Sequence, residues 1–148
     1  MGKIYFASDF HLGTPNDAES RIRERKIVAW LNSIAPDCDA LYLMGDVFDF
    51  WYEYQHTAPK GFVRLLGKLA EMSDSGIPIT FFPGNHDLWA KEYLEQEIGW
   101  KTIRRPIRIS LQGKKCLLGH GDGLGPGDYG FKWMSKVFHA SWAQWLFS

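Results

Sequence analysis

The 148-residue sequence lacks any long hydrophobic run, and this argues against a membrane-spanning segment. No stretch approaches the ~20 consecutive apolar residues that a transmembrane helix needs. The apolar run from Ile4 to Ala7 is far too short for the core of a secretory signal. We therefore expect a cytoplasmic protein.

The sequence also has no net charge and only two cysteines. Lys plus Arg and Asp plus Glu are balanced at 17 each, which gives no global electrostatic case for a nucleic-acid partner. The two cysteines, Cys38 and Cys116, lack metal-binding spacing, so reduced thiols are expected. One local group of cations is expected to form the solvated face of a helix, namely Arg21, Arg23, Arg25 and Lys26.

The apolar pattern alternates between strand and helix over the length of one domain. Residues 3–8, 40–44 and 77–82 are short apolar segments typical of buried strands. Two sets of apolar residues between them follow helical spacing: Ile27, Trp30, Leu31 and Ile34, and then Phe62, Leu65, Leu66 and Leu69. This order predicts parallel strands joined by right-handed crossovers. Residues 103–111 and 115–118 flank Gln112-Gly113 and predict a hairpin, so the fold class is mixed α/β.

Four short motifs, each at an expected strand end, are rich in metal-binding side chains. They are Asp9-Phe10-His11, Gly45-Asp46-Val47-Phe48-Asp49, Gly84-Asn85-His86-Asp87 and Gly119-His120-Gly121-Asp122. An isolated Asp or Asn often only caps a turn, and an isolated His is often a simple polar group. Three of the five histidines fall within these motifs, however, and the strand ends of an open α/β sheet are where ligands bind. The set favours a metal centre.

The spacing assigns the ligands to two ions. Asp9 and His11 lie two residues apart, so an extended strand would point both to the same side. Asp46 is expected to bridge two cations roughly 3.5–4 Å apart, with Asn85 and His120 serving the second ion. Oxygen and imidazole donors without thiolate suit Mn²⁺, Fe²⁺ or Zn²⁺.

His86 is interpreted as a catalytic acid that protonates a departing phosphate oxygen. Either Asp87 or Asp49 is expected to orient its ring, and Asp87 is included among the catalytic residues. Two metal ions activate water and polarise phosphoryl oxygens, so a protein nucleophile is not needed. The motifs thus predict a two-metal phosphoester-cleaving enzyme.

Asp-x-His, Gly-Asp-x-x-Asp, Gly-Asn-His-Asp and Gly-His-Gly-Asp in this order resemble the calcineurin-like metallophosphoesterases over most of the chain. The resemblance implies a layered α/β sandwich with mixed sheets. It also implies one metal at Asp9, His11 and Asp46, a second at Asp46, Asn85 and His120, and His86 near the leaving group.

Within that superfamily, residues 40–48, 73–78 and 120–147 resemble the UDP-2,3-diacylglucosamine hydrolases. The resemblance implies hydrolysis of the pyrophosphate of this nucleotide-lipid substrate to UMP and 2,3-diacylglucosamine 1-phosphate. It further implies a place in lipid A biosynthesis at the inner membrane surface, usually with Mn²⁺. Some members of this branch carry Arg where this chain has His86.

Members of the family continue through a helical cap to a Gly-His-x-His motif, which this sequence does not contain. We therefore expect residues 1–128 to form a catalytic core that is incomplete at its C-terminus, and residues 129–148 to begin the helical cap. An apolar stripe at helical spacing in the second segment is expected either to pack in a core or to face acyl chains and the membrane: Phe131, Met134, Phe138, Trp142 and Trp145.

Several alternatives remain open. One alternative is a phosphoesterase that acts on another substrate, namely a nucleotide, a cyclic nucleotide or a phosphoprotein. Another is that the chain is a non-catalytic scaffold. The aromatic run from Phe48 to Tyr54 is able to stack on a base, although packing over the sheet is favoured. Gly125-x-Gly127-x-x-Gly130 is interpreted as a turn leading into the cap. The sequence leaves the oligomeric state and the metal identity undetermined.

Overall fold

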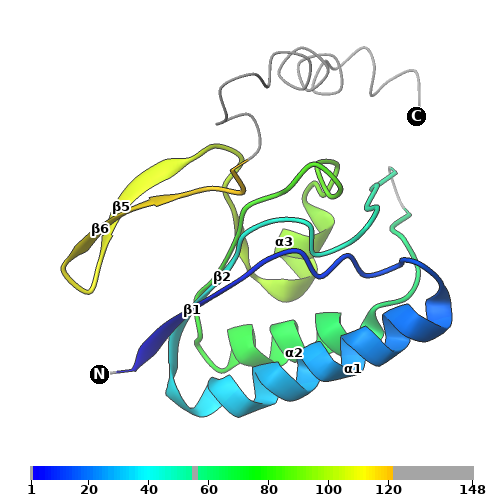
Figure 1. Ribbon diagram of the computed structural model, residues 1–148, viewed down its shortest axis with the longest axis horizontal. Helices are drawn as coiled ribbons and strands as arrows, with labels where there is room; N and C mark the ends of the chain where they lie inside the picture. Colours follow the sequence, from blue (N-terminus) through cyan, green and yellow to red (C-terminus); the bar gives the residue numbers. More distant parts are fainter. Residues whose placement is uncertain (1, 55–56, 122–148) are drawn as a thin grey trace.

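The computed structural model describes residues 2–54 and 57–121, which form a mixed α/β fold (Figure 1). The elements in chain order are β1 (Lys3–Ala7), α1 (Asp17–Ile34), the 3₁₀ helix η1 (Ala35–Asp37), β2 (Cys38–Leu43), α2 (Val63–Asp74), β3 (Ile79–Phe81), α3 (Tyr93–Ile98), β4 (Lys101–Thr102), β5 (Ile107–Leu111) and β6 (Lys114–Leu118). The expected cap stripe, the glycine-rich turn and the proposed boundary at residue 128 lie outside the described residues.

The strands form two sheets with different pairing. The first sheet has the order β1-β2-β3-β4 and all of its pairs are parallel, whereas β5 and β6 pair antiparallel. The parallel crossovers predicted by the strand and helix alternation are therefore confirmed. The hairpin is confirmed as well: Gln112 and Gly113 both have positive φ, 47° and 79°, as a two-residue type I′ turn requires.

Two apolar clusters lie on opposite faces of the parallel sheet. Alternate residues of β2 serve both, because Leu41 and Leu43 join the larger cluster under the helices while Tyr42 joins a smaller one with Phe82 and Leu118. Figure 1 shows α1 and α2 running side by side on one side of the sheet, with the hairpin on the other. Each fully buried Leu contributes about 1.5–3 kcal/mol relative to an exposed one, so the burial of Leu41 and Leu43 fixes which face of the sheet packs against the helices.

The helices begin in two different ways. Helix α1 follows the N-cap Asn16, whose side-chain oxygen accepts the Glu19 N–H at 3.0 Å. At the start of α2, within the described chain, the N-cap Phe62 makes no side-chain capping bond. Instead, the buried Glu24 of α1 accepts the N–H groups of Arg64 at 2.9 Å and Leu65 at 3.1 Å. Its carboxylate thus caps α2 from the neighbouring helix.

Three short elements were not predicted. The 3₁₀ helix η1 has three residues, helix α3 has six and strand β4 has two, so each is too short to show a recognisable helical or strand period in the sequence. Residues 2–54 and 57–121 contain no helix that combines the length and apolar character needed to cross a bilayer. Cys38 and Cys116 are free and half-buried.

Candidate metal centre

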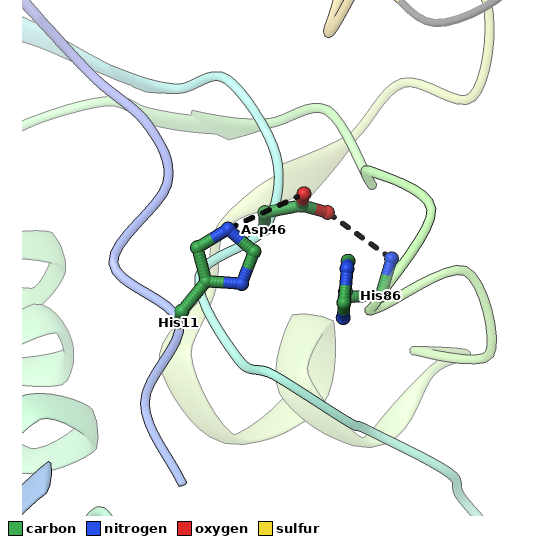
Figure 2. Close-up of side chains that lie close together, drawn as sticks. All are labelled: His11, Asp46 and His86. Carbon is green, nitrogen blue, oxygen red and sulfur yellow. Dashed lines mark hydrogen bonds and ion pairs between the residues drawn. The ribbon is translucent and has the colours of Figure 1, made fainter. Parts of the chain in front are cut away.

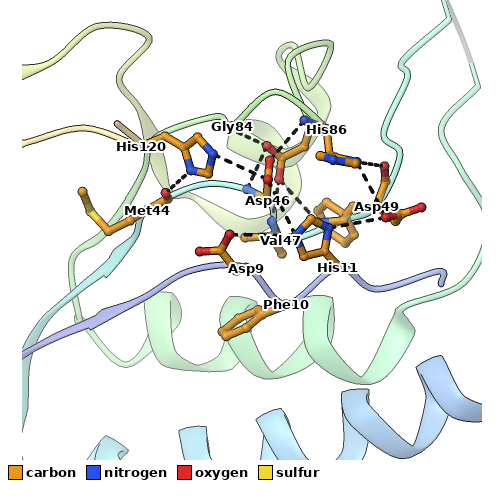
Figure 3. A network of polar contacts seen from close by, with 12 residues as sticks. Asp9, Phe10, His11, Met44, Asp46, Val47, Asp49, Gly84, His86 and His120 are labelled. Atoms are coloured by element: carbon orange, nitrogen blue, oxygen red, sulfur yellow. Dashed lines mark hydrogen bonds and ion pairs between the residues drawn. The ribbon is translucent and has the colours of Figure 1, made fainter. Parts of the chain in front are cut away.

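The first three motifs meet beyond the ends of β1, β2 and β3, at one edge of the parallel sheet. Backbone bonds tie the first loop to the second: the Asp9 N–H donates to Gly45 O and the His11 N–H to Asp46 O, both at 3.0 Å. Figure 3 shows their side chains converging on Asp46. The convergence expected from the strand order is what the fold produces.

Asp46 stands at the centre of the group and is only 4% exposed. Its Oδ2 lies 3.7 Å from His11 Nε2 and 3.5 Å from His120 Nε2, so one oxygen faces two imidazoles (Figure 3). Its Oδ1 accepts the His86 backbone N–H at 3.1 Å. One carboxylate oxygen is thus held by the backbone while the other faces the candidate ligands.

Asp9 and His11 lie together, but their expected extended geometry is wrong. Strand β1 ends at Ala7, and both residues have left-handed backbones, with φ of 57° and 43°. This turn brings Asp9 Oδ1 to 3.8 Å from His11 Nε2. Asp46 is also left-handed, with φ of 52°. Such conformations cost of order 1–3 kcal/mol in a residue other than glycine and concentrate at functional sites.

His120 is oriented by a backbone carbonyl. Its Nδ1 lies 2.7 Å from Met44 O. A carbonyl oxygen only accepts hydrogen bonds, so Nδ1 carries the proton and the lone pair of Nε2 faces Asp46. This is the arrangement in which metal-binding histidines are usually fixed by their second nitrogen.

His86 is held in the same way by Asp49. Its Nδ1 lies 2.7 Å from the Asp49 carbonyl oxygen and 3.6 Å from Asp49 Oδ1, and the same Oδ1 lies 3.4 Å from His11 Nδ1. The His11 and His86 rings meet edge to face with centroids 4.8 Å apart. Figure 2 shows both rings beside Asp46. Of the two residues considered for orienting His86, Asp49 is the one in contact, and it makes the hydrogen bond through its backbone carbonyl.

Asp87 occupies a different place from the one expected. It is fully buried and accepts four backbone N–H groups: from Val47 and Gly84 at 2.7 Å, from Asp46 at 3.3 Å and from Phe48 at 3.4 Å. Burial raises the pKa of this carboxyl, partly offset by the N–H donors. Asp87 therefore ties the second and third loops together through their backbone N–H groups, and its catalytic role stays a prediction.

The donors present fit divalent metal ions. One candidate ligand atom each from His11, Asp46 and His86 lie within 4.8 Å of one another. The separations of 3.5–3.8 Å around Asp46 Oδ2 and His11 Nε2 exceed good hydrogen bonds. Two donors that each lie ~2.1 Å from one ion, at an angle of roughly 90–130°, are about 3–3.8 Å apart. Carboxylate and imidazole are also the donors that Mn²⁺, Fe²⁺ and Zn²⁺ accept.

Comparison with known proteins is consistent with this chemistry. The family model of the calcineurin-like phosphoesterases matches residues 2–146. The chain belongs to this family.

Two curated relatives are both called UDP-2,3-diacylglucosamine hydrolase. That of Porphyromonas gingivalis is 48% identical over 120 residues, covering 81% of this chain and 46% of the relative. That of Aeromonas hydrophila is 32% identical over 146 residues, covering 96% of this chain and 57% of the relative. The chain therefore spans about half the length of these relatives.

A solved structure shares the fold. A protein of unknown function from Aquifex aeolicus superposes with a TM-score of 0.55 at 20% identity, covering 91% of this chain and 71% of that one. At this identity the likeness shows the fold alone, namely the layered α/β architecture expected of a calcineurin-like phosphoesterase.

Two glycines of the second and third motifs leave space for the candidate ligands. A Cβ on Gly45 would collide with the His120 ring and approach the Gly84 Cα to 2.9 Å, and Gly45 also has a φ of 97°. A Cβ on Gly84 would collide with the Asp46 carboxylate and lie 2.7 Å from its backbone nitrogen. Both motif glycines are therefore required sterically, since the second and third loops approach at backbone distance.

Asn85 lies at the rim of a pocket beside this centre. It is exposed, and the pocket of about 210 Å³ is lined by Asp49, Phe50, Asn85, His86, Leu88 and Trp89. Phe50 is 62% exposed and meets Trp89 edge to face. Packing of the aromatic run, the favoured expectation, holds for the fully buried Phe48 and Trp51, whereas Phe50 lines this pocket.

The sequence analysis missed one residue that supports the first loop. Arg23 was expected on a solvated helix face, but it is half-buried and its Nη1 donates to the carbonyl oxygens of Phe10 at 3.2 Å, His11 at 2.7 Å and Thr14 at 3.1 Å. Every residue has a backbone carbonyl, so bonds to such acceptors do not depend on which residue types are present in the loop. The sequence therefore carries no signal that separates Arg23 from its exposed neighbours Arg21 and Arg25.

Proposed function

We propose that this protein is a metal-dependent phosphoesterase that hydrolyses the pyrophosphate of UDP-2,3-diacylglucosamine, giving UMP and 2,3-diacylglucosamine 1-phosphate for lipid A biosynthesis. The observation that carries the proposal is Asp46 Oδ2, which faces the Nε2 atoms of both His11 and His120 at 3.7 and 3.5 Å. The names of the relatives supply the substrate.

Two divalent ions, Mn²⁺ first among them, complete the proposed site. Asp9, His11 and Asp46 would hold one ion, and Asp46, Asn85 and His120 the other. When bound, such a pair supplies an activated water and polarises the phosphoryl oxygens. The protein contributes the fixed orientation of the donors, with Nδ1 of His120 anchored on Met44 O at 2.7 Å.

His86 is the proposed proton donor to the departing phosphate oxygen. Its Nδ1–H is engaged by the Asp49 carbonyl at 2.7 Å, so its Nε2 is the nitrogen left to deliver a proton. Its backbone N–H binds Asp46 Oδ1 at 3.1 Å, which keeps the acid and the central carboxylate in a fixed relation. A general acid placed in this way contributes about 10²–10⁴-fold to the rate.

The pocket beside His86 supports a substrate that is both polar and apolar. Asp49, Asn85 and His86 line it with Phe50, Leu88 and Trp89. A phosphate at the metal centre with an apolar or aromatic group beside it fits such a lining. We further propose that the protein works at the cytoplasmic side of the inner membrane as a peripheral protein, through the apolar stripe of residues 129–148.

The test is Mn²⁺-dependent release of UMP from UDP-2,3-diacylglucosamine by the 148-residue chain and by the full product of its gene. Release by either supports the proposal. Cleavage of bis(p-nitrophenyl) phosphate without UMP release would keep the metal chemistry but overturn the substrate. Failure with both compounds, in both forms of the protein, would overturn the enzyme.

Two substitutions separate the proposed roles. Asp46→Asn is expected to abolish turnover and weaken both metals, because one carboxylate serves both ions. His86→Ala is expected to leave Mn²⁺ binding intact and slow turnover by about 10²–10⁴-fold. An unaltered rate in His86→Ala would remove the acid role, and near-normal turnover in Asp46→Asn would contradict the bridging carboxylate.

A further inference from the structure

Helix α1 supports the first metal loop through two side chains one turn apart. The buried Ser20 accepts the Gly13 N–H on its Oγ at 2.8 Å. Arg23, three residues later on the same face, donates to the carbonyls of Phe10, His11 and Thr14. One hydroxyl and one guanidinium therefore fix the loop that carries His11.

The three carbonyl oxygens converge on a single nitrogen. Arg23 Nη1 lies 3.2 Å from Phe10 O, 2.7 Å from His11 O and 3.1 Å from Thr14 O. Carbonyls that converge in this way concentrate partial negative charge and repel one another unless a cation lies between them. The guanidinium supplies that charge together with hydrogen-bond donors, and charge-assisted bonds are roughly twice as strong as neutral ones.

The opposite side of the loop is held by the second motif. The Leu12 N–H donates to Val47 O at 3.1 Å and the Asp49 N–H to Leu12 O at 2.9 Å. Leu12 itself is fully buried. The loop is thus fixed between the second motif on one side and Arg23 on the other, while His11, between these supports, adopts a left-handed φ of 43°.

We propose that Arg23 is a positioning residue of the metal centre: it holds the Phe10–Thr14 loop in the left-handed turn that directs His11 Nε2 toward Asp46. The inference rests on the proposed function only in that Asp9, His11 and Asp46 bind a metal. Arg23 acts through His11 and not on substrate. Without it, the three carbonyls lose their common donor, the turn relaxes, and the imidazole leaves its place 3.7 Å from Asp46 Oδ2.

The experiment measures Mn²⁺ affinity by calorimetry on the 148-residue chain, well below its unfolding temperature. Arg23→Ala is expected to weaken Mn²⁺ binding by about 10–100-fold, the range typical of residues that orient metal ligands. Arg25→Ala is the matched control, because it removes the same charge from an exposed position on the same helix. Its Mn²⁺ affinity is expected to equal that of the wild type.

Two further measurements distinguish positioning from general stabilisation. Arg23→Lys keeps the charge on a side chain that is one bond shorter than the path to Arg23 Nη1, so its affinity should fall between those of wild type and Arg23→Ala. Methylguanidine in the buffer should restore part of the affinity of Arg23→Ala. A residue that only stabilised the fold would lower the urea midpoint in EDTA without changing the affinity of the folded protein.

The outcomes are separable. Equal Mn²⁺ affinity of wild type and Arg23→Ala, both folded by circular dichroism, overturns the inference and leaves the proposed function standing. If Arg23→Ala does not fold, wild-type affinity in Arg23→Lys overturns it. A wild-type chain that binds no Mn²⁺ overturns the inference, while the proposed function is decided separately by the turnover test, which also uses the full product of the gene.

Discussion

Replacing Asp87 tests whether this carboxylate is structural or catalytic. Asp87→Ala removes an acceptor that is fully buried and receives two short N–H bonds of 2.7 Å, from Val47 and Gly84, and two longer ones. Each bond to a charged group contributes about 1.5–3 kcal/mol, so the two short bonds suggest a loss of about 3–6 kcal/mol. Burial raises the pKa of Asp87, which shows that its charge carries a desolvation cost. The lower end, about 3 kcal/mol, is therefore expected.

A loss of this size is a large part of the 5–15 kcal/mol that stabilises a typical domain. The assay is urea unfolding in EDTA at pH 7, followed by tryptophan fluorescence, so that metal binding plays no part. Asp9→Asn is the control, since Asp9 has a 58% exposed side chain and asparagine also tolerates the left-handed backbone. Asp9→Asn should change stability by less than about 0.5 kcal/mol and yet weaken Mn²⁺ binding.

Asp87→Ala is thus expected to lose stability, whereas Asp9→Asn is expected to keep its stability and to bind Mn²⁺ more weakly. A loss below about 1 kcal/mol in Asp87→Ala would refute the reasoning, because it would mean that the N–H groups find other partners or water. A folded Asp87→Ala with wild-type stability but greatly reduced turnover would restore Asp87 to the catalytic group.

Three other changes give measurable outcomes. Gly84→Ala is expected to eliminate Mn²⁺ binding in calorimetry, whereas Gly67→Ala, a helical position with open space around it, should bind normally and gain about 0.5–1 kcal/mol in urea unfolding. Glu24→Ala should lose about 2 kcal/mol in the same assay, because two N–H groups at the start of α2 lose their acceptor. Lys3, 2.7 Å from Asp37, lowers the pKa of Asp37, so the stabilisation is present above about pH 4 and is lost as the pH falls through the folded value. The stability difference between wild type and Asp37→Asn should therefore shrink in urea titrations between pH 7 and pH 3, and a gap that widens on acidification would contradict it.

The sequence predicted the elements whose patterns extend over several residues. The period of α1 identified Ile27, Leu31 and Ile34, all of which are buried. The cap of α2 was not predictable, because Glu24 lies 40 residues before Arg64 in the chain and within an amphipathic helix where a charged residue signals solvent. A contact between two elements that are far apart in the chain produces no periodic pattern in the local sequence.

The candidate ligands were found for a different reason: the strand order alone brings the ends of β1, β2 and β3 to one edge. For the orientation of His86 the sequence left two candidates, Asp87 and Asp49. Asp87 is its neighbour in sequence, but its carboxylate points into the protein toward backbone N–H groups. Asp49, 37 residues away, provides the contact instead. Adjacency in a tight turn does not imply contact, since successive side chains point in different directions.

The left-handed residues show why the local geometry of the site was not predictable. Among the described residues other than glycine, five have positive φ, and three of them are the candidate ligands Asp9, His11 and Asp46. At about 1–3 kcal/mol each, their combined strain approaches the net stability of a domain, so contacts elsewhere must offset it. Three sets of contacts are placed to offset this strain. They are the backbone bonds of Asp9 and His11 to the second loop, the bonds donated by the Arg23 guanidinium, and the bonds accepted by the Asp87 carboxylate. These supports come from the chain's own backbone and side chains, so the chain itself fixes the positions of the donor atoms around Asp46.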